Sequence, residues 1–237
     1  MQNETNEYPA YPASLQSLND AMRFAASREN FEIHPAVLYA PGQEKKNVFL
    51  VALRGTNRSF DKTDVLGLNT CLMAFLGKPN IYLDLVKKGM SAKIPTGSEV
   101  VMIGHSLGGM IAQMIVADEQ MKAAYRFLNV LNIGSPYVPV KDRPCPLHRF
   151  ADKADIVPWL GRSIKANLKT EKPVFKSNGY FGRIVAAHTD SYRNSPSWRP
   201  YDVFGELDGG RVLVFTDHLA ESSSSASESS SADKQQV

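Results

Sequence analysis

The chain has 237 residues, and its 27 lysines and arginines against 24 acidic residues leave a net charge of +3 at pH 7. This length suits a single α/β domain with a full core, and the lack of a dense basic block argues against nucleic-acid binding. No apolar run is long enough to span a bilayer, and the polar N-terminus lacks the basic start and apolar core of a signal peptide. We therefore expect a cytoplasmic protein, or one exported without a recognisable signal peptide.

The first half of the chain mixes helical and extended patterns. Apolar residues at helical spacing indicate helices, whereas β-branched and aromatic runs between turn residues indicate strands. These patterns predict, in order, a helix over Ser14–Arg28, strands over Phe31–Tyr39 and Asn47–Leu53 with a turn at Pro41-Gly42, and a helix over Pro79–Gly89. Before that last helix, Asp61–Gly77 contains more large apolar residues than an exposed loop should.

The second half alternates strands with helical segments. The expected elements are a short strand over 100–103, a helix over Met110–Ala124, and strands over Phe127–Ile133, His148–Ala151 and Arg211–Phe215. This alternation favours an α/β fold with a mostly parallel central sheet and helices on both faces. We expect one domain over residues 1–220. The Ser-rich segment 221–237 is predicted to be a disordered tail, because it has too little apolar surface to offset its ordering entropy.

The most informative motif is Gly104-His105-Ser106-Leu107-Gly108, a G-x-S-x-G pentapeptide between the short strand and the helix that follows. In this context the motif predicts a sharp strand-to-helix turn that exposes a nucleophilic Ser106 at a helix N-terminus. Glycines are needed on both sides of the serine because a Cβ there would collide with the neighbouring strand or helix. The alternative is a glycine-rich turn that merely links the two elements.

A nucleophilic serine needs a general base, and the base needs a carboxylate to orient it. In the folds that carry this turn, the chain order is serine, acid, histidine. This order excludes His34 and His105 as bases and disfavours His148, which precedes the best acid. His188 and His218 remain, and we favour His188 because His218 borders the predicted disordered tail, where tight positioning is difficult.

The best candidate for the acid is Asp155. It follows a predicted strand and a short polar stretch, which is where open α/β sheets place their functional sites. Asp152 is the local competitor. Asp155 could instead be a turn-forming residue ahead of Pro158.

The oxyanion hole needs two backbone N–H groups near the nucleophile. The first is expected from Leu107, the residue after the serine. The second is expected from the loop after the strand Asn47–Leu53, where Gly55 allows a close backbone approach and Thr56 offers both an N–H and a hydroxyl. On its own, an Arg-Gly-Thr sequence is most often a simple turn.

Five segments occur in an order that resembles the class 3, fungal-type, triacylglycerol lipases of the α/β-hydrolase fold. They are Val51–Thr56, Gly104–Gly109, Asn132–Pro136, Asp155–Pro158, and His188 with Tyr192 four residues later. The resemblance implies the α/β-hydrolase fold, a catalytic triad of Ser106, Asp155 and His188, and an oxyanion hole formed by Thr56 and Leu107. It also implies that Asn57–Gly77 takes the place of the family's mobile lid. In that segment Lys62 follows Asp61, where the family usually has a tryptophan after an aspartate.

These residues predict a serine carboxyl-ester hydrolase that acts on lipid or other acyl esters through an acyl-enzyme intermediate. An acyltransferase or thioesterase would use the same triad with another acceptor, and a non-catalytic binding module is the remaining alternative. Cys71 and Cys145 lack metal-ligand spacing and establish no disulfide, and we expect neither a metal nor a cofactor. Asp61–Gly77 is either a flap that turns outward in transient contact with a lipid surface, or a buried core helix.

Overall fold

The structure is a computed structural model that describes residues 14–15, 17–26, 30–39, 44–56, 64–160, 174–176, 184–195 and 211–214. The predicted turn at Pro41-Gly42, the Ser-rich segment 221–237 and His218 lie outside these ranges. The predicted division of the chain into a domain and a tail therefore stays a prediction.

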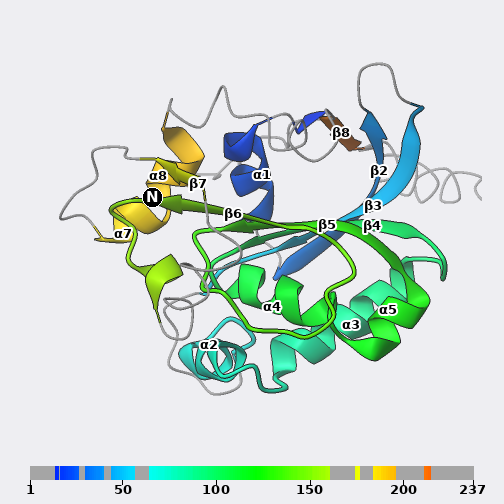
Figure 1. Cartoon of the computed structure of the whole chain (residues 1–237), viewed down its shortest axis with the longest axis horizontal. Coiled ribbons are helices and arrows are strands. Elements are labelled where there is room, and N and C mark those ends of the chain that lie inside the picture. Colours follow the sequence, from blue (N-terminus) through cyan, green and yellow to red (C-terminus); the bar gives the residue numbers. More distant parts are fainter. Residues whose placement is uncertain are drawn as a thin grey trace, which may run out of the picture.

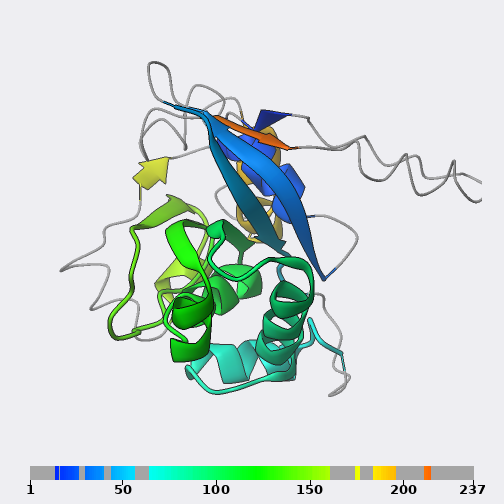
Figure 2. The ribbon, with the colours of Figure 1, turned by 90° about the vertical axis from the view of Figure 1, so that its right-hand side faces the viewer.

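The described strands form one eight-stranded sheet in the order β1-β8-β2-β3-β4-β5-β6-β7. They are β1 (Ser14–Leu15), β2 (Phe31–Tyr39), β3 (Lys46–Leu53), β4 (Glu99–His105), β5 (Arg126–Ile133), β6 (Leu147–Asp152), β7 (Val174–Lys176) and β8 (Arg211–Val214). The strands from β3 to β7 are parallel, whereas β2, β8 and β1 extend the sheet as an antiparallel edge. Figure 2 shows β8 (orange) running beside β2 (blue) at this edge.

Helices cover both faces of the sheet, as Figure 1 shows. One face carries α1 (Leu18–Ala25), and the other carries α2 (Leu68–Phe75), α3 (Ile81–Lys93), α4 (Leu107–Ile115) and α5 (Glu119–Ala124). A cluster of buried apolar side chains lies on each side of the sheet. The predicted α/β fold, with a mostly parallel sheet between two layers of helices, is therefore confirmed.

Two predicted helices differ from the observed ones for local reasons. The helix expected over Ser14–Arg28 is shorter, because its first residues pair with β8 as β1, and Ser17 then caps α1. The helix expected over Met110–Ala124 is divided into α4 and α5. The Asp118 side chain accepts the Met121 N–H and so begins a new helix in the middle of the apolar pattern.

The other predicted elements of the described ranges are found close to their expected places. The helix expected over Pro79–Gly89 is α3, which starts after Asn80 because that side chain accepts the Leu83 N–H. β7 was not predicted. Two short helices, α7 (Ile184–His188) and α8 (Asp190–Asn194), lie between β7 and β8. No helix within the described ranges has both the length and the apolarity that a membrane span requires.

Candidate active site

Ser106 lies at the turn between β4 and α4, with a backbone φ of 52° and ψ of −119°. A positive φ costs a non-glycine residue on the order of 1–3 kcal/mol and persists only where the surroundings enforce it. A Cβ on Gly104 would lie 2.5 Å from the backbone of Gly108, and a Cβ on Gly108 would lie 2.2 Å from the Leu53 carbonyl oxygen. The turn therefore has the strained, glycine-dependent backbone that the pentapeptide predicts.

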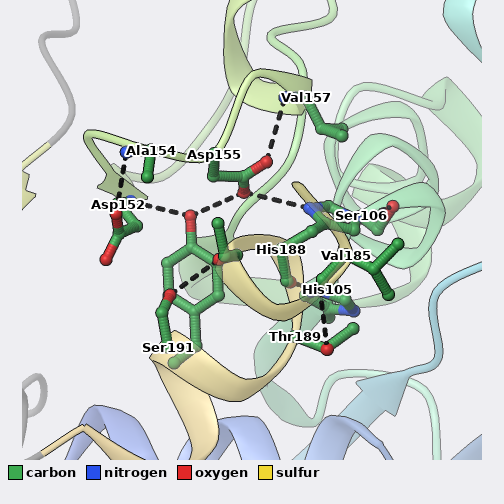
Figure 3. A network of polar contacts seen from close by, with 12 residues as sticks. His105, Ser106, Asp152, Ala154, Asp155, Val157, Val185, His188, Thr189 and Ser191 are labelled. Carbon is green, nitrogen blue, oxygen red and sulfur yellow. Dashed lines mark hydrogen bonds and ion pairs between the residues drawn. The ribbon is translucent and has the colours of Figure 1, made fainter. Parts of the chain in front are cut away.

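Ser106, His188 and Asp155 belong to one network of polar contacts, shown in Figure 3. The Ser106 hydroxyl lies 2.9 Å from His188 Nε2, and His188 Nδ1 lies 2.9 Å from Asp155 Oδ2. Because a carboxylate only accepts, Nδ1 carries the ring proton and Nε2 is left as an acceptor for the serine proton. The three side chains come from the turn after β4, the loop after β6 and the end of α7. The structure thus brings together the three residues that the sequence analysis selected, and their catalytic roles stay predictions.

Asp155 is fully buried, and described residues donate to both of its carboxylate oxygens. Oδ2 accepts from His188 and, at 2.8 Å, from the Tyr192 hydroxyl, while Oδ1 accepts from the Val157 N–H at 3.0 Å. The Tyr192 hydroxyl in turn accepts the Asp152 N–H at 2.8 Å. Burial and the adjacent Asp155 carboxylate raise the pKa of Tyr192, so the phenol keeps the proton that it donates. These bonds offset the cost of removing the carboxylate from water.

Asp152, the alternative acid, is also fully buried but has a different role in the loop. Its Oδ1 accepts the Ala154 N–H at 2.8 Å. The sequence analysis named Tyr192 without giving it a role. Its position one helical turn after His188 is the signal that would have found it, because residues four apart lie on the same side of a helical segment.

The histidines of the described ranges have distinct surroundings. His34 Nε2 lies 2.9 Å from a Glu32 carboxylate oxygen, and His148 belongs to β6. His105 is buried, and its Nε2 lies 2.8 Å from the main-chain oxygen of His188. Among these histidines, His188 is the one that contacts the Ser106 hydroxyl.

The two residues predicted to form the oxyanion hole both lie close to the serine. Leu107 is the first residue of α4, whose opening N–H groups have no partner within the helix. A Cβ on Gly55 would lie 3.1 Å from Ser106 Cβ, so the loop that carries Thr56 reaches the same point.

The Thr56 hydroxyl itself is buried, and among the described residues it meets no partner with the geometry of a regular hydrogen bond. Burial raises the pKa of the Cys71 thiol of α2, and the neighbouring Thr56 hydroxyl opposes part of this rise. A buried hydroxyl without a strong partner is costly, and it suits a place where charge develops on a substrate oxygen. The role of Thr56 nevertheless stays a prediction.

The described part of the predicted flap Asp61–Gly77 is a turn followed by α2, and residues 57–63 lie outside the described ranges. Three of its side chains are buried, and they belong to Leu66, Thr70 and Ala74. Its most exposed apolar side chains, 42%, 57% and 51% exposed, are Leu68, Leu72 and Leu76. These leucines are spaced four apart and form a stripe along one side of the segment. The segment is therefore packed on the core, but it is not a buried core helix.

Further exposed apolar side chains flank the acid and the base. Ile156 follows Asp155 directly, Leu160 lies four residues beyond it, and Val185 precedes His188 by three residues on α7. Figure 1 shows α2 and α7 toward the same end of the molecule. The Cys71 side chain of α2 interacts with Thr56. The helix that carries the leucine stripe therefore touches the predicted oxyanion loop.

Within the described ranges, no group of three or more histidine, cysteine, aspartate or glutamate side chains is placed to hold a metal ion. Cys71 and Cys145 are not joined to each other.

No protein-family model matches the chain, and neither does any curated protein. Among solved structures, the chain is similar to the crystal structure of the Lip2 lipase from Yarrowia lipolytica, with 13% sequence identity and a TM-score of 0.30. The match covers 56% of this chain and 63% of the lipase chain, so this chain spans less than two thirds of the lipase structure. A likeness this weak carries no argument about activity, and a function must be inferred from the geometry of the site.

Proposed function

We propose that this chain is a serine hydrolase that cleaves carboxyl esters through an acyl-enzyme intermediate. The observation that carries the proposal is the 2.9 Å contact between the Ser106 hydroxyl and His188 Nε2, with Asp155 2.9 Å from the opposite ring nitrogen. Serine, histidine and aspartate in this relation form a hydrolytic triad on unrelated folds, so geometry rather than overall similarity identifies it. The pentapeptide turn and the chain order Ser106, Asp155, His188 favour the α/β-hydrolase version of that triad.

In the first half of the reaction, Ser106 Oγ attacks the ester carbonyl carbon while His188 Nε2 accepts the serine proton. Asp155 holds the ring in the tautomer with the proton on Nδ1 and stabilises the imidazolium that forms. The carbonyl oxygen becomes an oxyanion, which accepts from the N–H groups of Leu107 and Thr56 and from the Thr56 hydroxyl. The tetrahedral intermediate then collapses: the bond to the leaving alcohol breaks, and His188 gives that alcohol its proton.

In the second half, a water molecule attacks the acyl-serine ester. His188 Nε2 accepts a proton from this water, and the same donors stabilise the second oxyanion. Breaking the bond to Ser106 Oγ releases the carboxylic acid, and the serine recovers its proton from His188. The net reaction converts an ester and water into an acid and an alcohol, with no cofactor.

We further propose that the preferred esters carry long apolar acyl chains, as in a lipase or a phospholipase. The exposed stripe on α2, together with Ile156 and Val185 beside the acid and the base, supports this choice, because a lipid chain is a natural partner for exposed apolar side chains. The segments that resemble the class 3 lipases point to the same substrate class.

A covalent probe and a substrate series test the proposal. A fluorophosphonate should label the wild-type chain and the control Ser91→Ala, whose serine lies on the exposed side of α3, but not Ser106→Ala. The wild type should hydrolyse p-nitrophenyl esters, with kcat/KM rising with acyl length, and phospholipid vesicles should show whether head groups are accepted. Labelling that persists in Ser106→Ala, or a folded wild type that hydrolyses none of these esters, would contradict the proposal.

A further inference from the structure

His105 precedes the proposed nucleophile and is buried beside the base, as Figure 3 shows. Its Nε2 lies 2.8 Å from the main-chain oxygen of His188. A carbonyl oxygen only accepts hydrogen bonds, so His105 Nε2 carries the proton and donates it. The side chain of His105 therefore holds the backbone of the same residue whose side chain Ser106 contacts.

The opposite edge of the His105 ring faces the predicted oxyanion loop. A Cβ on Gly55 would lie 2.8 Å from His105 Nδ1, so this loop can approach the ring closely only because residue 55 is glycine. The ring centroids of His105 and His188 are 4.7 Å apart, and those of His105 and Tyr192 are 6.3 Å apart. One imidazole thus contacts the loop that carries Thr56, the base, and the tyrosine that holds the acid.

The base requires such a support because the helices around it are short. α7 and α8 have five residues each, and helices of this length do not maintain themselves without tertiary contacts. The bond from His105 fixes the end of α7 to β4, independently of the contact between Ser106 and the His188 ring. Consecutive residues of the turn therefore hold the main chain and the side chain of the base.

The support works only if the ring of His105 stays neutral, because a second positive charge would oppose the imidazolium that His188 becomes during the reaction. Burial does most to keep the ring neutral, the charges of His188 and Arg193 add to this, and the bond to the His188 main chain opposes it; the net effect lowers the pKa of His105 from its ordinary value of 6.5 to about 3. At neutral pH the ring is consequently an uncharged donor at Nε2.

We propose that His105 is a positioning residue that fixes the base and the oxyanion loop relative to Ser106 through its neutral Nε2–H. The inference rests on the proposed hydrolase function. It is independent of substrate identity, because the bond ties two parts of the protein and contacts no substrate.

Two substitutions of nearly equal size and shape separate the donor from the bulk of the ring. His105→Gln keeps an N–H where Nε2 stands, whereas His105→Met fills similar space without a donor. We expect His105→Met to lower kcat by about 10- to 100-fold with little change in KM, because small misplacements of catalytic groups are costly. The kcat of His105→Gln should stay within about threefold of the wild-type value, because the amide N–H retains most of the energy of the hydrogen bond. His34→Met, a histidine distant from Ser106 in the sheet, is the matched control and should keep wild-type kcat.

A proton NMR measurement gives a readout that does not need turnover. The Nδ1–H of His188, bonded to Asp155, should give a strongly downfield resonance in the wild type and in His105→Gln, and this signal should broaden or vanish in His105→Met. Equal kcat values and equal spectra for the Gln and Met variants would overturn the proposal, whether both resemble the wild type or both are impaired. If His105→Met does not fold, His105→Asn replaces it, because the shorter amide cannot reach the His188 carbonyl. If the wild type hydrolyses no ester, the proposed function fails, while the NMR comparison still decides the role of His105.

Discussion

The two sides of the proposed active site are built in different ways. The nucleophile lies between β4 and α4, and eight of the nine residues of α4 are buried between the sheet and the outer helices. The base is the last residue of α7, where Val185 is exposed and His188 is only partly buried. The packed core of the fold therefore positions the nucleophile, whereas two short, partly exposed helices carry the base.

Polar contacts between distant parts of the chain hold the base side in place. The Asn19 amide of α1 donates to the main-chain oxygen of Tyr192 at 2.8 Å and to that of Ser195 at 3.3 Å. Tyr192 and His105 add the contacts to Asp155 and to His188 that were described above. Hydrogen bonds weaken steeply when their angle departs from linearity, so these contacts fix the direction of the groups that they join. The comparison predicts that changes on the base side alter activity first, and that changes on the nucleophile side also alter folding stability.

The largest effect is expected for His188→Ala. Triad members act as a unit, so kcat should fall on the order of 10⁴- to 10⁶-fold, about as far as in Ser106→Ala, and the double variant should lose little more. The urea midpoint should fall as well, because the buried Asp155 carboxylate keeps the donors from Tyr192 and Val157 but loses the one from His188. Steady-state kinetics and urea unfolding of the three variants check this.

The competing histidine gives the control for this prediction. His218→Ala, and truncation after Glu221, should leave kcat near the wild-type value. If His218→Ala abolishes turnover while His188→Ala preserves it, the base is His218, and the contact between His188 and Ser106 has no catalytic meaning.

The same division between the two sides explains what could be predicted from sequence. The turn at Ser106 was predictable because its backbone strain demands glycines at fixed offsets, and the strand and helix around it have clear apolar patterns. The choice of His188 followed from chain order and from the predicted disordered tail beside His218, and not from the surroundings of His188 itself. The contacts that hold it join residues 83 and 173 positions apart, His105 to His188 and Asn19 to Tyr192, and such pairs leave no periodic trace in one sequence. The division of the predicted helix at Asp118 shows a local signal, an N-cap, that the apolar pattern concealed.

A second prediction concerns the pH dependence of stability on the nucleophile side. Unfolded His105 binds a proton below its ordinary pKa of 6.5, whereas in the folded protein its pKa is lowered to about 3. The contribution of His105 to the free energy of unfolding is thus fully present above pH 6.5 and is lost as the pH falls toward 3. From pH 7 to pH 4 the loss should be about 3 kcal/mol. Urea unfolding across this range should show a shallower pH dependence for His105→Gln than for the wild type, and equal slopes would contradict the lowered pKa.

A smaller effect is expected for Tyr192→Phe on the base side. Asp155 would keep the donors from His188 and Val157 but lose the phenol, and kcat should fall on the order of tenfold, as expected for one charge-assisted hydrogen bond. The buried Asp152 N–H would also lose its acceptor, at a cost of about 1–3 kcal/mol in the free energy of unfolding. Kinetics and urea unfolding of the same preparation measure both quantities.

Tyr125→Phe is the matched control for the tyrosine substitution. Tyr125 is also buried, and its hydroxyl donates to the Ile94 carbonyl at 3.4 Å, in the core between the sheet and the outer helices. This variant should keep wild-type kcat. If both phenylalanine variants keep it, the phenol of Tyr192 serves the fold and does not hold the acid for catalysis.

The smallest effect is expected for substitutions in the leucine stripe of α2. Such substitutions test whether the exposed leucines beside the site contact a lipid surface. Leu72 is 57% exposed, so Leu72→Asp should barely change stability or the hydrolysis of a short soluble ester. At an aggregated substrate the same side chain would leave water, and a carboxylate there opposes that transfer. The rate increase that the wild type should show above the solubility limit of its ester should therefore fall several-fold in Leu72→Asp. Leu85→Asp, an exposed leucine on α3, should retain the increase. A wild type whose rate saturates smoothly through the solubility limit would contradict this role, and the stripe on α2 would then be an exposed surface without a part in substrate binding.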